Sequence, residues 1–293
     1  MKKILAYITP EKHAGFFDLV IAYDSEVEVI VPYTEISPQE VKDVIYGAVF
    51  TRNPRDLKNT AIFIGGHDFE RSQELLNSSL DVLKNLPEKF RVSIAFDPDG
   101  ACTTAASCVV KIKSYLKNLS KKRALILAGT GPVGQCVAVF LSKEGCTNVS
   151  ITSRNLQKAR EITKKLNERY NLKIKPLEVK NYNSDEITNI LSNTEIIIST
   201  GPEGICLLKK ETWEKFPKIE VLADVNAVEP LGIEGVKVKD DGVKRNGKIC
   251  FGAFAIGALK IKVHYKLMKM LFEKQDIYDM QKIYEITEKL KKN

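Results

Sequence analysis

The chain has 293 residues, of which 44% are hydrophobic, and its 45 Lys and Arg against 37 Asp and Glu give a formal net charge of +8. This length predicts two domains, each large enough for its own hydrophobic core, and the composition excludes a disordered chain. The lysines are scattered and no basic stripe with interleaved aromatic residues is present, so we expect no nucleic-acid partner. A small anionic ligand accounts for the positive charge equally well.

The cysteines and histidines argue against a disulfide framework and against a metal site. The six cysteines include no C-x-x-C pair and mostly fall in apolar segments, which is typical of reduced core residues in a cytoplasmic protein. Only three histidines are present and no carboxylate cluster accompanies them, so no metal is expected. The stretch from Met1 to Pro10 holds only a short strand-like run, so neither a signal peptide nor a membrane partner is expected.

The first part of the chain alternates strand and helix. Ser37 and Pro38, for example, are typical of the N-cap and the first position of a helix. The expected strands are 4–9, 27–31, 61–64 and 91–96, and the expected helices are 15–23, 38–48, 69–83 and 105–116. Such alternation builds a mostly parallel sheet with helices on both faces. We therefore predict an α/β domain over residues 1–118.

The alternation resumes after a polar crossover at 117–122 and predicts a second domain over residues 119–262. Its expected strands are 124–128, 148–152, 174–179, 195–200 and 219–225, and its expected helices are 135–143, 156–170, 185–191 and a long one from the run 251–260 to about 272. A last helix at 278–290 is expected to pack on the first domain, so that residues 263–293 join it. The predicted fold class is α/β, with two α/β domains of which the second is a Rossmann-type doubly wound parallel sheet.

A glycine-rich turn follows the buried strand at 124–128. Its glycines have the G-x-G-x-x-G spacing, and a helix and a second strand come after it. Glycine is needed there because the backbone must turn sharply and approach a pyrophosphate, while the helix N-terminus supplies amide donors. This context predicts a dinucleotide site with the cofactor-binding residues Gly129, Thr130, Gly131, Pro132, Val133 and Gly134.

The end of the second strand indicates which dinucleotide is bound. An NAD site usually carries Asp or Glu about 20 residues after the turn, whereas this chain has Ser153 and Arg154, with Lys158 one helical turn further on. A hydroxyl, a guanidinium and an ammonium group suit an added phosphate, so we expect NADP, with NAD possible. Alternatively, Arg154 and Lys158 are ordinary solvated charges of a Lys-rich protein.

Later strands of the second domain deliver further polar residues to the edge of the sheet. Thr200 and Gly201 follow the strand 195–200, and Asp224 and Asn226 end the strand 219–225. Doubly wound sheets bind ligands at the carboxyl ends of their strands. We therefore add these four residues to the expected cofactor site.

Several longer motifs resemble those of the NAD(P)-dependent methylene-tetrahydromethanopterin dehydrogenases. They span nearly the whole chain in the family's order: TAIFIGGHD at 60–68, FRVS at 90–93, DPDGACTTAA at 97–106, LAGTGPVG at 127–134, IEVLADVNA at 219–227, PLGI at 230–233 and FGAFAIGALKIKVH at 251–264. The chain departs from the family's pattern at 201–208, where a small apolar loop is more common, and at Cys102, where a polar residue is common. These departures concern the substrate pocket more than the cofactor.

The resemblance implies hydride transfer between NADP and the one-carbon unit of a reduced pterin carrier, in a homo-oligomeric enzyme of one-carbon metabolism. Loss of hydride from the methylene bridge leaves a methenyl cation spread over two nitrogens, and no proton moves in that step. This reaction can run on positioning and electrostatics, which agrees with the lack of a recognisable catalytic triad in the sequence. The related folate dehydrogenase-cyclohydrolases carry Tyr-x-x-x-Lys in their first domain. That spacing does not occur before residue 119, so cyclohydrolase activity is not expected.

Candidate substrate and catalytic residues come from the same motifs. Asp97 could bind the pterin or lie near the developing cation, or it could only cap the next helix. Lys260 and His264 are one helical turn apart, so they either line the pocket together or are solvated charges of the helix. His67 follows the end of a strand, where it either contacts the ligand or is an ordinary loop residue. The predicted catalytic residues are Asp97 and Lys260, and the predicted substrate-binding residues are His67, Thr103, Thr104 and His264.

Other functions remain open at this point. One is a methylene-tetrahydrofolate dehydrogenase or another NADP-dependent dehydrogenase of similar fold, such as a shikimate-type or glutamyl-tRNA-reductase-type enzyme. The latter two need a proton donor or a nucleophilic cysteine in the first domain, whereas Cys102 and Cys108 have no nearby basic partner in the sequence. Another alternative is a non-catalytic sensor that binds NADP.

Overall fold

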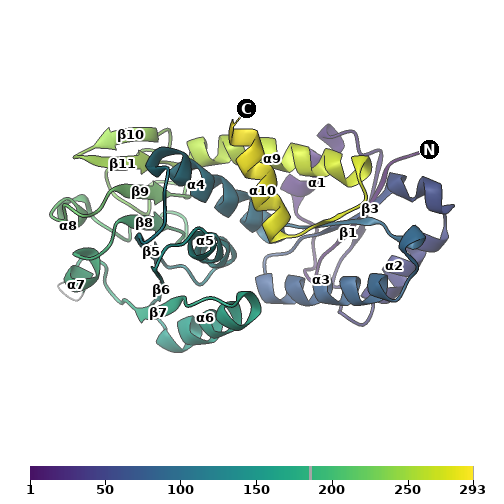
Figure 1. Cartoon of the computed structure of the whole chain (residues 1–293), viewed down its shortest axis with the longest axis horizontal. Helices are drawn as coiled ribbons and strands as arrows, with labels where there is room; N and C mark the ends of the chain where they lie inside the picture. The colour runs from purple at the N-terminus through teal and green to yellow at the C-terminus, as the bar shows by residue number, and fades with distance from the viewer. Residues whose placement is uncertain (185–186, 293) are drawn as a thin grey trace. The chain divides into compact units, whose positions relative to one another are not determined.

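The computed structural model describes residues 1–184 and 187–292, and within these ranges the strands form one sheet of five and one sheet of seven (Figure 1). The chain divides into two compact units. The first unit comprises Met1–Thr103 together with the chain from Ile261 onwards, and the second comprises Thr104–Lys260. The mixed α/β fold with parallel sheets confirms the predicted fold class.

The boundaries of the units differ from the predicted divisions at 118 and 262. Helix α4 (Ala101–Leu116) belongs to the second unit from Thr104 onwards. Its Tyr115 ring lies edge-on to Phe251, and its buried Lys111 donates to a carboxylate oxygen of Asp241 at 2.8 Å. These contacts join α4 to elements some 130 residues later, which the polar stretch after the helix does not reveal.

The first unit is built around a parallel sheet in the order β12-β4-β3-β1-β2. Its strands are β1 (Ile4–Ile8), β2 (Val29–Tyr33), β3 (Thr60–Ile64), β4 (Ser93–Phe96) and β12 (Ile277–Tyr278). Its helices are α1 (Phe16–Asp24), α2 (Val41–Phe50), α3 (Phe69–Lys84), the part of α9 (Ala253–Glu273) from Ile261 onwards, and α10 (Met280–Lys292), with 3-10 turns at Pro54–Asn59, Glu88–Phe90 and Pro98–Gly100.

Helices cover both faces of this first sheet. In Figure 1, α1 and α9 lie on one side of β1 and β3, and α2 and α3 lie on the other. Strand β3 is buried along its whole length, which explains its run of apolar residues. Helix α3 begins at the N-cap Asp68, whose side chain accepts from the amides of Glu70 and Arg71.

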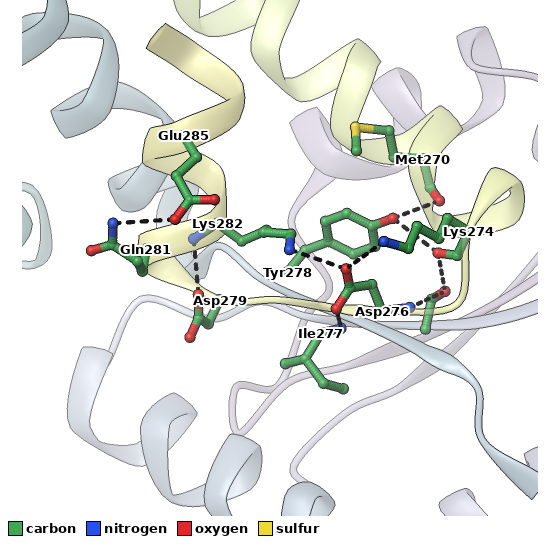
Figure 2. Close-up of polar contacts among 10 residues, drawn as sticks. Met270, Lys274, Asp276, Ile277, Tyr278, Asp279, Gln281, Lys282 and Glu285 are labelled. Atoms are coloured by element: carbon green, nitrogen blue, oxygen red, sulfur yellow. Dashed lines mark hydrogen bonds and ion pairs between the residues drawn. The ribbon is translucent and has the colours of Figure 1, made fainter. Parts of the chain in front are cut away.

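The C-terminal segment closes the first unit through contacts that the sequence pattern does not predict. The Tyr278 hydroxyl lies 3.0 Å from the carbonyl oxygen of Met270 and 2.9 Å from that of Lys274, so the two carbonyls share its one proton (Figure 2). The Asp276 carboxylate pairs with the Nζ of Lys282 at 3.1 Å, which holds the start of α10 against the short strand β12. Because β12 pairs with β4, the chain from Ile261 onwards, which includes the last helix, belongs to the first unit.

The second unit contains the sheet β10-β11-β9-β8-β5-β6-β7. Apart from the antiparallel edge strand β10, each pair is parallel, and the order of β7-β6-β5-β8-β9-β11 is that of a Rossmann sheet. The strands are β5 (Arg123–Leu127), β6 (Asn148–Ser153), β7 (Lys175–Glu178), β8 (Ile196–Ser199), β9 (Val221–Asp224), β10 (Asp241–Arg245) and β11 (Lys248–Phe251). The helices between them are α5 (Pro132–Lys143), α6 (Leu156–Tyr170), α7 (Thr188–Leu191) and α8 (Lys210–Trp213).

Some elements of this unit were missed. The hairpin of β10 and β11 turns at Asn246 and Gly247, both with positive φ, but its strands show no clean alternation of apolar residues. The predicted helix 185–191 is observed as α7 from Thr188, and positions 185 and 186 lie outside the described residues.

Strand β5 lies inside the second sheet and faces a core on each side. Leu125 and Leu127 belong to a buried apolar cluster that includes Trp213, while Ala124 and Ile126 are buried on the opposite face. The loops that follow the carboxyl ends of β5, β6, β7 and β8 surround the candidate site.

Candidate functional site

The glycine turn between β5 and α5 gives each glycine a separate role. A Cβ at Gly129 would lie 2.6 Å from Cγ2 of Ile126, and one at Gly134 would lie 2.5 Å from the backbone of Gly129. A Cβ at Gly131 would meet no atom within 4 Å. Gly131 is also the N-cap of α5, where it leaves the first turn of the helix open to an anion. Two glycines therefore allow close packing, and the third leaves the space over the helix N-terminus clear.

The turn starts at a strained residue, Ala128, which has φ of +49° without being glycine. Its amide donates to the Thr152 hydroxyl and to the Tyr182 hydroxyl, each at 3.0 Å. Thr152 comes from the end of β6, and Tyr182 comes from the loop after β7. Side chains from two neighbouring strands thus hold the start of the turn.

A cavity of about 730 Å³ opens beside this turn at the carboxyl ends of the strands. Its walls come from the turn, from the β6–α6 junction, from the loop after β7 and from the loop after β8. The lining residues are Ala128, Thr130, Gly131, Ser153, Arg154, Asn155, Lys158, Lys180, Asn181, Tyr182, Asn183, Thr200, Gly201, Pro202, Ile205, Cys206 and Leu207.

The charge of the cavity wall has one sign. Arg154, Lys158 and Lys180 are exposed cations, and none of the lining residues in the described chain is Asp or Glu. Asn155 caps α6 by accepting from the amide of Lys158 at 3.0 Å. This bond fixes the start of the helix, where Arg154 lies just before the cap and Lys158 lies in the first turn. Cations without a competing carboxylate suit a phosphate group. The Asp or Glu that usually binds the ribose in an NAD site is missing from the described lining residues.

The predicted cofactor-binding residues divide between the cavity wall and its support. Those on the wall are Thr130, Gly131, Ser153, Arg154, Lys158, Thr200 and Gly201. The others, which are not among the lining residues, are Gly129, Pro132, Val133, Gly134, Asp224 and Asn226. The hydroxyl of Thr200 donates to the carbonyl of Leu127 at 3.2 Å, and a Cβ at Gly201 would lie 2.6 Å from the Leu207 side chain. Both residues therefore also shape the wall.

Asp224 and Asn226 hold loops together. The Asp224 carboxylate is fully buried and accepts from the amides of Asn226 at 3.0 Å and Ile233 at 2.7 Å. Burial raises the pKa of this carboxyl to about 6, and its backbone hydrogen bonds limit the rise. The Asn226 side chain donates to the carbonyl of Pro202 at 3.3 Å. These contacts position the loops after β8 and β9, and a direct cofactor contact by either residue stays a prediction.

The loop after β7 was not recognised from the sequence as part of the site. Lys180, Asn181, Tyr182 and Asn183 all line the cavity. A signal was present, since β7 is the third strand of the nucleotide-binding half and its carboxyl end must lie beside that of β6. The loop's mixture of Asn, Tyr and Lys gave no motif by which to find it.

In the first unit, Asp97 and Thr103 bind one another. Asp97 is fully buried and accepts from the amide of Thr103 at 3.1 Å and from its hydroxyl at 2.7 Å. The Thr103 hydroxyl also lies 3.1 Å from the carbonyl of Gly100. Asp97 thus binds a residue in the first turn of α4, and whether it also serves the substrate, the other interpretation of the sequence, stays a prediction.

The other predicted substrate residues lie in different surroundings. His67 is exposed, and its Nδ1 is 3.0 Å from a carboxylate oxygen of Asp99. His264 is fully buried, stacks on Phe63 with a centroid distance of 5.7 Å, and has its Nε2 3.7 Å from Asp18. Thr104 and Lys260 are half-buried. The substrate and catalytic roles of these residues stay predictions.

The turn, the sheet order and the cationic cavity define the second unit as a dinucleotide-binding domain of the Rossmann type. Comparison with known proteins shows to which family the whole chain is related. The family model for the N-terminal domain of methylene-tetrahydromethanopterin dehydrogenase matches residues 16–99, and the model for shikimate / quinate 5-dehydrogenase matches residues 111–228.

Two curated relatives come from Methylorubrum extorquens strain AM1. The chain is 32% identical over 293 residues to a protein named bifunctional protein MdtA, with 99% of each chain covered. It is 28% identical over 282 residues to an NAD(P)-dependent methylenetetrahydromethanopterin dehydrogenase, covering 94% of this chain and 93% of the relative. The chain belongs to the NAD(P)-dependent methylene-tetrahydromethanopterin dehydrogenase family, as its motifs predicted.

Solved structures with this fold are more distant in sequence. The ligand-free 5-ketofructose reductase of Gluconobacter sp. strain CHM43 has a TM-score of 0.52 and 13% identity, with 99% of each chain covered. Quinate dehydrogenase from Corynebacterium glutamicum, solved in complex with NAD, has a TM-score of 0.51 and 12% identity, covering 97% of this chain and 98% of that one. At such identities the likeness concerns the fold alone.

Two further findings concern sites of other kinds. Among the described residues, none of the helices has the length and apolar character needed to cross a membrane. Within the same residues, no three or more His, Cys, Asp and Glu side chains gather as ligands for a metal ion.

Proposed function

We propose that this protein transfers a hydride between methylene-tetrahydromethanopterin, which gives the methenyl form, and NADP, in one-carbon metabolism. The observation that carries the proposal is the relationship, over nearly the whole chain, to relatives of which one is named as this NAD(P)-dependent dehydrogenase. The cationic cavity of the second unit supports it independently, because its exposed cations suit a phosphate group and it lies at the carboxyl ends of the strands of a Rossmann sheet.

The residues of the second unit fit the cofactor. The open backbone at Thr130 and Gly131 and the N-terminus of α5 would hold the pyrophosphate. Ser153, Arg154, Lys158 and Lys180 would hold the additional phosphate that distinguishes NADP from NAD. NADP, when bound, supplies the hydride acceptor.

The chain's own contribution to the chemistry is binding and orientation. Loss of hydride from the methylene carbon leaves a cation delocalised over two nitrogens, so no side chain has to take or give a proton in that step. A reaction of this kind needs the two carbons held about 3 to 3.5 Å apart and a favourable electrostatic environment for the cation. We propose Asp97 and Lys260 as candidates for that environment and His67, Thr103, Thr104 and His264 as candidates for substrate contacts.

The test is a direct assay of NADPH formation by absorbance. Methylene-tetrahydromethanopterin, methylene-tetrahydrofolate and shikimate are offered in turn with NADP or NAD. We expect turnover with the first substrate and NADP, a primary deuterium isotope effect when the bridge carbon is labelled, and no bell-shaped pH profile of the kind that an acid-base pair imposes. Turnover with shikimate alone would contradict the proposal, and NADPH binding without any turnover would favour a sensor.

Assembly of several copies of the chain is a further part of the proposal. Light scattering on a size-exclusion column measures it directly. A molar mass of a single chain of 32.9 kDa at working concentration would contradict it.

A further inference from the structure

The loop from Lys180 to Asn183 forms one wall of the cofactor cavity and is anchored by its last two residues. The Tyr182 hydroxyl lies 3.0 Å from the amide of Ala128 and 2.8 Å from the Thr152 hydroxyl. The next residue, Asn183, donates to the carbonyl of Leu207 at 3.1 Å and accepts from the amide of Lys209 at 2.8 Å. The loop therefore joins the glycine turn to the segment after β8, whose Leu207 also lines the cavity.

The direction of each hydrogen bond around Tyr182 follows from the groups involved. The Thr152 hydroxyl has one proton, and the carbonyl of Ile126 at 2.9 Å can only accept it. The Tyr182 hydroxyl must then donate its proton to Thr152 and accept from the amide of Ala128. Burial raises the pKa of Tyr182, so the hydroxyl keeps this proton in the ordinary working range.

This arrangement acts on the one strained residue of the turn. Ala128 has positive φ, a conformation that is unfavourable for a residue with a Cβ and that persists only where its surroundings hold it. The two hydroxyls that accept from its amide supply that restraint. The same Tyr182 side chain lies two positions after Lys180, which is one of the three cations on the cavity wall.

We infer that Tyr182 is a positioning residue for the cofactor. Its hydroxyl fixes the left-handed start of the phosphate-binding turn and, through the loop, presents Lys180 to the phosphate that distinguishes NADP from NAD. The inference rests on the proposed function in so far as the ligand is NADP. It assigns a role to a loop that no dinucleotide motif includes.

The substitution Tyr182→Phe isolates the hydroxyl. The ring stays in its buried cluster, and the amide of Ala128 keeps Thr152 as an acceptor, so the protein should fold with a melting midpoint within about 3 °C of the parent. The Kd for NADPH, measured by fluorescence titration, should rise roughly threefold to tenfold, the scale of one neutral hydrogen bond. Tyr115→Phe is the matched control, since it removes a phenolic hydroxyl from a half-exposed ring on α4, and it should bind NADPH as the parent does.

A second pair of measurements separates positioning from mere support of the fold. Lys180→Ala is made in the parent and in Tyr182→Phe, and NADPH and NADH are titrated against all four proteins. We expect Lys180→Ala to weaken NADPH but not NADH, and to cost clearly less once Tyr182 is Phe. An unchanged Kd in Tyr182→Phe, or strictly additive losses, would overturn the inference. Failure of the parent itself to bind NADPH would instead overturn the proposed function.

Discussion

The polar residues at the carboxyl edges of the two sheets differ in whether they are bonded within the protein or exposed to a cavity. In the first unit, the polar residues that the sequence singles out are largely engaged within the protein, as in the bond of buried Asp97 to Thr103. In the second unit, the corresponding edge is an open cavity whose cations, Arg154, Lys158 and Lys180, face it as exposed side chains. The second edge presents exposed cations without a carboxylate among the described lining residues, while Asp97 at the first edge is bonded within its own unit.

The difference teaches that a motif near a strand end has two possible meanings, and that exposure separates them. A buried carboxylate with two donors from one residue stabilises the helix that follows it. A guanidinium on a cavity wall without an opposing carboxylate has no comparable structural task. The substitutions below test this contrast, in order of the expected effect.

The largest effect is expected from Gly134→Ala. The added Cβ would stand 2.5 Å from the backbone of Gly129, so the turn must move, at a cost of about 1 to 3 kcal/mol in the free energy of unfolding. A displaced turn should also weaken NADPH binding, because the amides of the turn and of the helix N-terminus that would hold the pyrophosphate move with it. Urea unfolding and fluorescence titration measure the two quantities.

Gly131→Ala is the control for that variant. Its Cβ would meet no protein atom within 4 Å and its backbone is extended, so stability should change by less than about 0.5 kcal/mol. NADPH affinity should nevertheless fall, because the methyl group occupies the path of the pyrophosphate. Binding as tight as that of the parent would show that this turn does not hold phosphate.

The next effect concerns cofactor choice. A charge-assisted hydrogen bond contributes about 1.5 to 3 kcal/mol, so Arg154→Ala should weaken NADP about tenfold to a hundredfold and leave NAD nearly unchanged. Titration with both cofactors measures the ratio. Lys164→Ala serves as the control, since Lys164 is an exposed cation on α6, the helix that follows Arg154, and lies outside the cavity wall. Equal losses of NADP and NAD in Arg154→Ala would mean that Arg154 supports the fold.

A smaller, pH-dependent effect is expected from Asp224. Its pKa is about 6 in the folded protein against 3.8 as the ordinary value, so the folded state binds a proton more readily than the unfolded state between these values. The resulting stabilisation is fully present below pH 4 and is lost as the pH rises through 6. Between pH 4 and pH 6, this group lowers the free energy of unfolding by at most about 1.4 kcal/mol for each unit that the pH rises.

The measurement is the free energy of unfolding of the parent and of Asp224→Asn from pH 4 to pH 8. The parent should gain stability relative to the variant as the pH falls from 6 to 4. A constant difference between the two proteins would show that Asp224 titrates normally, as an exposed carboxyl does.

The smallest effect, and the one that most sharpens the contrast, is expected from Asp97→Asn. If the carboxylate only caps α4, the variant should keep its single-turnover rate and nearly all of its stability, because Asn is about as good a cap as Asp. Thr103→Val, which removes the hydroxyl donor at similar volume, should lower stability more than Asp97→Asn does, because it leaves the buried carboxylate with one donor fewer. A rate at least tenfold slower with unchanged NADP affinity would show that Asp97 stabilises the cation and would break the contrast.

By itself the sequence determined the family, the two α/β domains and the glycine turn, because these depend on local patterns: buried apolar strands, helix caps and a fixed glycine spacing. It also placed Arg154 and Lys158, since both closely follow β6. What only the tertiary structure decided depends on contacts between distant segments. One example is the place of α4 in the second unit. A second is the burial of Asp97, which accepts from Thr103 and is not exposed at the edge of the sheet. A third is the position of the loop with Lys180 and Tyr182 on the cavity wall. The Tyr182 hydroxyl accepts from the amide of Ala128, which lies 54 positions earlier in the chain. No rule of sequence spacing predicts such a hydrogen bond, because only the folded sheet brings the two residues together.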